Sequence, residues 1–131
     1  MKKLLALLFS IFVSFNSYGD WVNVASDVDN ADFYYVDNES IIKNGRYLYY
    51  WELHDYGKSL SKTEVLMSAK VYKEVDCQMK KYKVLSDYYY SNQMGNGNLV
   101  HQSDEADTEW TYTAPGNIDE MLITFSCEYI K

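Results

Sequence analysis

Downstream of residue 20, hydrophobic and polar side chains alternate with a period of two, the pattern of β-strands that bury one face. The segment 47–54 is the clearest case. One of its faces carries Tyr47, Tyr49, Trp51 and Leu53, and the other carries Leu48, Tyr50, Glu52 and His54. Seven such segments predict strands at 21–24, 33–36, 47–54, 66–77, 80–91, 99–102 and 109–113. Short polar turns separate them, which predicts an antiparallel meander of about six strands.

Turn residues predict two hairpins within this meander. Ile41-Ile42 leads into Asn44-Gly45, the strongest hairpin signal in the chain, for which we expect a type I′ turn with positive φ at both residues. Gln78-Met79 predicts a second, tight turn between segments 66–77 and 80–91, although this pair seldom forms turns. Four residues of segment 80–91 share one phase of the alternation: Tyr82, Val84, Tyr88 and Tyr90.

A helix follows the last strand. The Pro-Gly pair at 115–116 ends that strand, Asn117 is placed as an N-cap, and Glu120 completes a capping box. An apolar stripe at helical spacing follows: Ile118, Met121, Leu122 and Phe125. Cys127 lies away from this stripe on a helical wheel. We therefore expect the helix to end or unwind near Ser126.

Segment 66–77 supplies the sheet face that receives this helix. Its alternation places one set of residues together: Met67, Ala69, Val71, Val75 and Cys77. We expect this apolar face to pack against the helix. The predicted fold class is thus α+β, an antiparallel sheet of about six strands packed on one C-terminal α-helix.

The first nineteen residues have the features of a secretory signal peptide. Lys2 and Lys3 precede an apolar run, and small residues precede an expected cleavage between Gly19 and Asp20. An uncleaved membrane anchor is the alternative, but the run is short for the ~20 residues of a spanning helix. The expected mature domain, residues 20–131, is one domain of 112 residues with no membrane span. No cysteine near the cleavage site offers a lipid attachment.

Charge narrows the classes of partner. The whole chain has 12 basic and 19 acidic residues; removing the two signal lysines leaves 10 against 19, a formal charge of −9. Such a surface repels phosphate backbones and anionic lipid, which argues against nucleic acid as a partner.

The chain has two cysteines, Cys77 and Cys127. Two cysteines in an exported chain most often form one disulfide, and a loop of about 50 residues closed in this way gains roughly 4 kcal/mol. Two free buried thiols are the alternative. Neither a CxxC nor an HxxxH spacing accompanies them, so we expect no metal site and no cofactor.

No segment predicts catalysis. His54 and His101 are the only histidines, and surface positions on strands are the favoured interpretation for both. No nucleophile motif such as GxSxG is present, so the chain is not expected to be an enzyme. Segment 27–32 begins like a calcium loop but lacks its sixth-position glycine and twelfth-position glutamate, which favours a solvated acidic turn. Segment 103–107 is interpreted in the same way. Lys131 is a candidate ligand for a lysine-binding receptor domain.

Fourteen tyrosines are the most unusual feature of the composition. Tyrosine has a high β-propensity and fills small cores, yet exposed tyrosine also supplies binding energy at interfaces. Three consecutive strand residues cannot all face inward, so at least one of Tyr88, Tyr89 and Tyr90 lies on the outer face. Partner interface and ordinary surface both remain open.

A series of short segments runs through nearly the whole expected mature domain: Trp21-Val22, 34–37 with Ser40-Ile41, 68–70, 74–77, Tyr90-Ser91, Met94-Gly95 with Gly97, Glu109-Trp110, Pro115-Gly116 and Cys127. In their order and spacing, these segments together resemble the surface-adhesin protein E family of bacterial envelope proteins. The resemblance implies an antiparallel sheet on a C-terminal helix, a disulfide matching Cys77 to Cys127, and a homodimer. It implies an adhesin; the family's namesake engages host proteins such as vitronectin, laminin and plasminogen.

We therefore expect a non-catalytic, adhesin-like binding module, exported to the periplasm or secreted, whose partner is a host matrix protein or an envelope protein. The namesake's basic binding segments have no counterpart in so acidic a domain, and its lipid anchor has no cysteine here. No binding residues are transferred. The alternative is a periplasmic structural or assembly protein that binds an envelope partner of the same cell.

Overall fold

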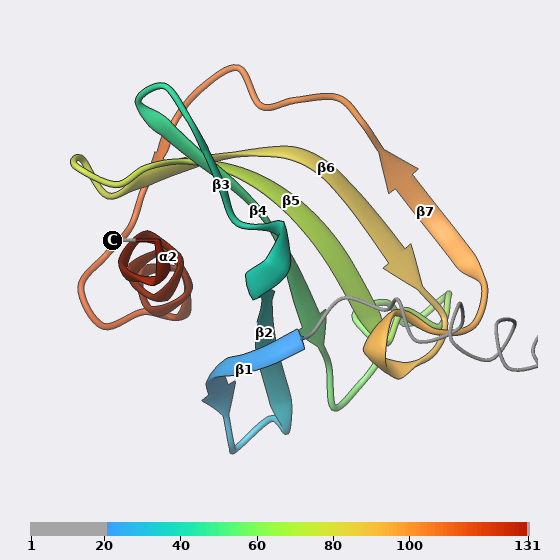
Figure 1. Cartoon of the computed structure of the whole chain (residues 1–131). Helices are drawn as coiled ribbons and strands as arrows, with labels where there is room; N and C mark the ends of the chain where they lie inside the picture. Colours follow the sequence, from blue (N-terminus) through green and yellow to red (C-terminus); the bar gives the residue numbers. More distant parts are fainter. Residues whose placement is uncertain (1–20, 131) are drawn as a thin grey trace, which may run out of the picture.

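The computed structural model describes residues 21–130, which form one curved antiparallel sheet with a single helix against its concave side (Figure 1). The strand order is β1-β2-β4-β5-β6-β7, with β3 pairing β4 and β8 pairing β6. The elements are β1 (Trp21–Asp27), β2 (Asp32–Asp37), η1 (Asn38–Ser40), β3 (Ile42–Asn44), β4 (Tyr47–Asp55), β5 (Ser68–Asp76), β6 (Lys81–Tyr90), η2 (Gln93–Gly95), β7 (Leu99–Ser103), β8 (Thr111–Tyr112) and α2 (Ile118–Tyr129). The predicted α+β meander is confirmed, with eight strands instead of about six.

Most strand boundaries shift from the prediction by up to three residues, as β1 and the last predicted strand illustrate. β1 extends past the predicted end at residue 24 to Asp27, because a bulge at Val24 keeps it paired with β2. The turn between the two strands consists of residues 28–31. Within the predicted strand 109–113, only residues 111–112 pair with β6 and form a strand. The predicted signal segment 1–19, its cleavage site and Lys131 lie outside the described residues. No helix within 21–130 is long and apolar enough to cross a bilayer.

The β3–β4 hairpin forms where predicted, but with a different turn. Asn44 pairs with Tyr47, so the two loop residues are Gly45 and Arg46. Of these, only Gly45 has positive φ, at 66°. Positive φ at the first loop residue alone is the pattern of a type II′ turn, which places glycine first. The expected type I′ turn over Asn44-Gly45 is therefore wrong by one residue in register.

The β5–β6 turn is stabilised by a side chain in place of typical turn residues. Asp76 Oδ1 accepts hydrogen bonds from the backbone N–H groups of Gln78 and Met79, each at 3.1 Å. Lys80 completes the reversal with a φ of 54°. An aspartate that bonds the backbone two residues on forms an Asx turn, which explains how so poor a turn pair closes a hairpin.

β6 contains a bulge that the alternation pattern did not reveal. Tyr72 pairs with Ser86 while the next residue, Lys73, pairs with Val84, so Leu85 has no partner on β5. An extra residue reverses which face later side chains occupy. Tyr82 and Val84 therefore face the helix, whereas Tyr88 and Tyr90 face the opposite side, contrary to their predicted common phase.

α2 begins as predicted and ends later. The Asn117 side chain accepts a hydrogen bond from the Glu120 N–H at 2.9 Å, the capping interaction expected from the sequence. The helix continues to Tyr129 instead of ending near Ser126. Three residues of the predicted stripe pack on the core, Leu122 fully buried and Ile118 and Phe125 partly. Met121 is instead 44% exposed, and Ile123, Ser126 and Cys127 are buried as well.

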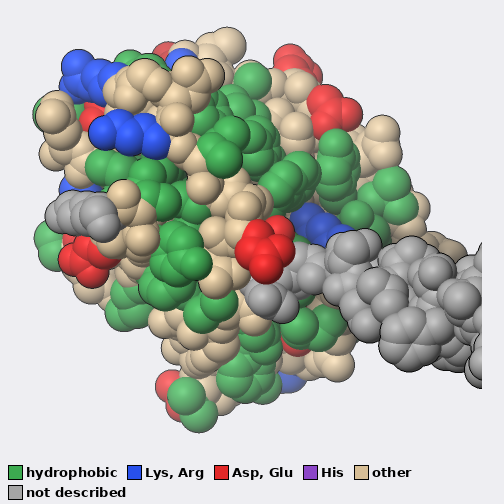
Figure 2. All heavy atoms as spheres, viewed as in Figure 1, with side chains coloured by type: hydrophobic (Ala, Val, Ile, Leu, Met, Phe, Trp, Pro, Cys, Tyr) green, Lys and Arg blue, Asp and Glu red, His purple; other side chains and the backbone are tan. Residues whose placement is uncertain are grey.

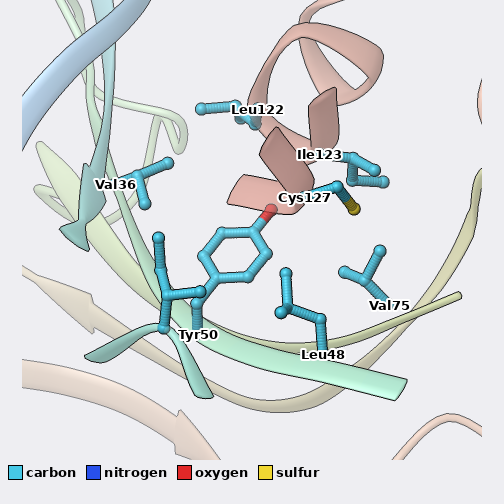
Figure 3. Packing of buried hydrophobic residues seen from close by; sticks show 8 residues of the cluster. Val36, Leu48, Tyr50, Val75, Leu122, Ile123 and Cys127 are labelled. Atoms are coloured by element: carbon cyan, nitrogen blue, oxygen red, sulfur yellow. The ribbon is translucent and has the colours of Figure 1, made fainter. Parts of the chain in front are cut away.

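The core lies between this side of α2 and the concave side of the sheet. Figure 3 shows its side chains converging from three strands and the helix: Val36, Leu48, Tyr50, Val75, Leu122, Ile123 and Cys127. Ile123 and Cys127 are one helical turn apart, so the helix need not unwind to present its sulfur. Cys77, directly after β5, is bonded to Cys127, with their Cα atoms 6.0 Å apart. This is the pairing that the family resemblance implied.

Candidate functional site: an aromatic face of the sheet

The sheet side turned away from α2 carries a continuous group of aromatic rings. In β4, Leu48 and Tyr50 enter the core, so the alternate residues point outward. Neighbouring strands and the segment before β8 contribute further rings, all partly exposed. We call this group the aromatic face: Tyr47, Tyr49, Trp51, Tyr72, Tyr88, Tyr90 and Trp110.

The rings of the aromatic face pack against one another across three strands. Trp51 lies 4.9 Å from Tyr72 and 5.7 Å from Tyr88, measured between ring centroids. Tyr72 also stacks with Tyr49 at 6.4 Å. Aromatic pairs at these spacings attract one another beyond the area they bury. The platform is therefore organised before any partner arrives.

Trp110 extends this platform from outside the central strands. Its ring lies 5.1 Å from that of Tyr47 and receives two lysines of β6. The Lys81 and Lys83 ammonium groups lie 4.9 and 4.8 Å from the Trp110 ring centroid, within cation–π range. Lys70 similarly lies 5.2 Å from the ring of Tyr90. The aromatic face thus gathers three lysines in a domain of strongly negative net charge.

Two carboxylates hold tyrosine hydroxyls of this face in place. Tyr49 donates a 2.5 Å hydrogen bond to Glu74, which, with burial and the Glu74 charge, raises the pKa of Tyr49 to about 12. Tyr88 donates to Asp104 at 2.6 Å, and this bond raises the pKa of Tyr88 and lowers that of Asp104. Both phenols therefore remain neutral at physiological pH.

The outward tyrosines agree only partly with the sequence prediction. Tyr47, Tyr49 and Trp51 share a face as predicted, and Tyr88 and Tyr90 satisfy the expectation of at least one outward tyrosine in 88–90. The lysines and the packing of Trp110 were not predicted. Period-two alternation in β5 and β6 places Lys70 and Lys83 outward. It does not predict that Trp110, in the segment before β8, packs against Lys83.

The comparisons with known families settle the kinship of this chain. Residues 21–128 match the family model described as Surface-adhesin protein E. The chain belongs to the surface-adhesin protein E family. The match covers nearly all described residues, including the aromatic face, the disulfide and α2, and membership makes the protein adhesin-like. No curated protein sequence matches the chain significantly.

Solved structures of Haemophilus influenzae protein E share the fold. Its crystal form II superposes with a TM-score of 0.66 at 17% sequence identity, covering 88% of this chain and 94% of that one. The selenomethionine form gives 0.63 at 15% identity, covering 86% and 89%. A structure of protein E from the non-typeable organism gives 0.55 at 16% identity, covering 85% and 86%. At this identity the likeness concerns the fold alone.

Beneath α2, this member of the surface-adhesin protein E family also buries an ionic cluster. The Lys73 ammonium, 2% exposed, lies 2.8 Å from the fully buried Glu52 and 3.3 Å from Asp119 of α2. His54 Nε2 lies 2.7 Å from Glu52, and Tyr50 donates to Glu52 at 2.5 Å. Burial alone raises the pKa of Glu52. The Lys73 charge and the bond with His54 outweigh burial and lower that pKa from 4.5 to about 2. We call this group the interior ion cluster.

Sequence predictions placed His54 on the surface, and this is wrong: its side chain is 17% exposed and belongs to the interior ion cluster. Lys73 was not predicted as a core residue at all. His101 is on the surface as predicted and lies 2.6 Å from Glu64. Neither histidine has a serine or cysteine as a hydrogen-bond partner within residues 21–130.

The acidic segment 27–32 spans the β1–β2 turn, and most of segment 103–107 is an irregular loop after β7. In the β1–β2 turn, Asn30 donates to Asp27 at 2.7 Å, and Asp32 accepts from the Gly57 N–H at 2.9 Å. These bonds occupy the carboxylates with backbone and amide donors. Within the described part of the chain, no three acidic, histidine or cysteine side chains gather in a way that could hold a metal ion.

Proposed function

We propose that this protein is a non-catalytic, exported binding module that engages a protein partner through the aromatic face. The main observation in support is the aromatic face itself, seven aromatic side chains that already pack together on the sheet side that α2 leaves uncovered. Tyrosine and tryptophan are enriched among the residues that supply most interface energy. Because their rings already pack together, little side-chain entropy is lost on binding.

Charge supports an acidic binding segment on the partner. Lys70, Lys81 and Lys83 lie among the rings. They outnumber the carboxylates of Glu74 and Asp104 on the same face, so this face is less negative than the domain as a whole. Such complementarity steers encounter and weakens with salt. We propose host extracellular proteins as the partner class, following the adhesin family; laminin, vitronectin and plasminogen are the first to test.

Truncating the platform tests the proposal. We expect Trp51→Ala/Tyr72→Ala to weaken binding of the mature chain to its partner by roughly 30-fold or more, the loss typical of an interface hot spot. Biolayer interferometry against the three host proteins measures it, at two salt concentrations. Lys81→Gln/Lys83→Gln should lower affinity less and reduce its salt dependence.

Tyr129→Ala is the matched control, because it removes an exposed tyrosine from α2 on the other side of the molecule. It should leave affinity unchanged. Circular dichroism must show that the Trp51→Ala/Tyr72→Ala variant is folded. Equal affinity of that folded variant and the unchanged chain would refute a role for the aromatic face, and absence of binding to every host protein would refute the host partner class.

We further propose that residues 1–19 are removed on export and that the mature domain, residues 20–131, carries no lipid anchor. We also propose that this domain forms a homodimer, as the family resemblance implies. Cell fractionation with external protease tests the location. Material found only in the periplasm and protected from protease would favour the alternative, an assembly protein binding an envelope partner of its own cell. Light scattering that gives a monomer mass would contradict the homodimer.

A further inference from the structure

A hollow of about 460 Å³ lies at the end of the molecule where the disulfide joins α2 to the sheet. The β3–β4 hairpin, the residues after β5 and the end of α2 enclose it. Its size is within the range of about 300–1,000 Å³ of small-molecule sites. It adjoins the aromatic face at Tyr47, which lines both, but its floor is on the core side of β4.

The floor of the hollow is apolar. It consists of Leu48, which is 2% exposed, the Cys77–Cys127 disulfide, and Ile130, which is 38% exposed at the end of α2. Apolar surface that lines a concave site favours hydrocarbon over water. An aliphatic or aryl body therefore fits this floor better than a sugar or a peptide backbone.

The rim of the hollow is cationic. Lys43 on β3 and Arg46 in the β3–β4 turn both line it. Arg46 Nη2 lies 3.1 Å from Asp76, whereas Lys43 is exposed and takes part in no ion pair within residues 21–130. Figure 2 shows lysine and arginine side chains gathered beside hydrophobic atoms at this end of the molecule. An ammonium group available above an apolar floor is complementary to an anionic head on a hydrocarbon body.

We propose that this hollow binds a free alkyl carboxylate, of the medium-chain fatty acid class. The carboxylate contacts Lys43, with Arg46 beside it, and the chain lies on Leu48, Ile130 and the disulfide. A site of this volume holds one short chain, which favours a single-chain acid over a two-chain phospholipid. A bound chain also covers the sulfurs, so occupancy protects the disulfide from reductant.

Decanoate, octanoate and decanol, each below its aggregation concentration, are the probes. Calorimetry on the mature chain should show decanoate binding roughly 15-fold tighter than octanoate, from two more buried methylenes at about fourfold each. Decanol should bind at least tenfold more weakly than decanoate, because its hydroxyl carries no negative charge to pair with the ammonium. Saturating decanoate should slow phosphine reduction of the disulfide severalfold.

Lys43→Gln should weaken decanoate binding about tenfold and leave decanol binding unchanged. Lys62→Gln is its matched control, an exposed lysine in the loop at the opposite end of β4 and β5. Ile130→Glu, placing a carboxylate at the floor, should abolish decanoate binding. The aromatic-face variant should bind decanoate normally, which separates this site from the proposed protein interface.

Unchanged decanoate affinity in both folded Lys43→Gln and Ile130→Glu would overturn the proposal. So would the absence of decanoate binding to the unchanged chain. Binding to vesicles of an anionic phospholipid without binding of free decanoate would overturn it in favour of a membrane surface.

Discussion

Glu52→Gln is expected to lower the free energy of unfolding by about 3–5 kcal/mol. The Lys73 side chain is 2% exposed. After the substitution, the remaining negative charge beside its ammonium is that of Asp119, at 3.3 Å, whose side chain is 37% exposed. Removing one partner of a buried ion pair is costly because the remaining charge is desolvated without compensation. Urea unfolding of the oxidised protein at pH 7 measures the loss.

Three further variants test whether that loss comes from a buried charge left without its partner. Lys73→Met alone should cost a similar amount, because it leaves Glu52 buried without its cation. The double variant should cost less than the sum of the single losses, since neither charge is then stranded. Glu128→Gln, an exposed carboxylate on the same helix, should cost under about 0.5 kcal/mol. Single losses below 1 kcal/mol would contradict a stabilising role for the interior ion cluster.

The same cluster should make the protein sensitive to acid. The pKa of Glu52 is about 2 when folded, below the ordinary 4.5, so the unfolded chain binds this proton more readily. Its stabilisation, on the order of 3 kcal/mol, is fully present above pH 4.5 and is lost as the pH falls toward about 2. Urea midpoints measured from pH 6 to pH 2.5 should fall less steeply for Glu52→Gln. Parallel curves for the two proteins would contradict this assignment.

Removal of the disulfide by Cys77→Ala/Cys127→Ala should lower the free energy of unfolding by roughly 4 kcal/mol. The bond closes a separation of 50 residues and links α2 to the end of β5, so its loss enlarges the unfolded ensemble. The helix has few other covalent or ionic ties to the sheet, so we expect its amide hydrogens to exchange faster than those of β4 and β5.

Cys127→Ala alone separates the covalent link from packing. It removes the bond but keeps the sulfur of Cys77, so its loss should nearly equal that of the double variant. Reduction of the unchanged protein should give the same decrease without any substitution. A loss below 1 kcal/mol in all three would show that the bond does not hold α2 on the sheet.

Much of the fold was predictable because its signals are local. Period-two alternation identified the strands, Asn117 with Glu120 identified the start of α2, and turn residues located the β3–β4 hairpin. These features depend on neighbouring residues and backbone sterics, which the sequence carries directly. The disulfide was predictable from composition, since two cysteines in an exported chain allow one pairing, and the family resemblance implied the same pair.

The candidate site was less predictable, because it depends on registers between strands. Nothing near Leu85 marks it as the unpaired residue, yet this bulge sends Tyr88 and Tyr90 outward to join the aromatic face. Trp110 reaches Tyr47 only because β8 returns along β6. Such placements are decided by competition among whole strand pairings, each of which moves many side chains together.

The sequence by itself determined the α+β meander, the capped terminal helix and a surplus of tyrosine, because each depends on periodicity or composition. Tertiary structure alone decided that Lys73 is buried with Glu52, that α2 buries Ile123 and Cys127 in place of Met121, and which rings meet. Lys73 is buried because Glu52 from another strand and Asp119 from the helix meet its ammonium there, and a helix buries the side that matches the sheet's shape. Both conditions join residues far apart in the chain.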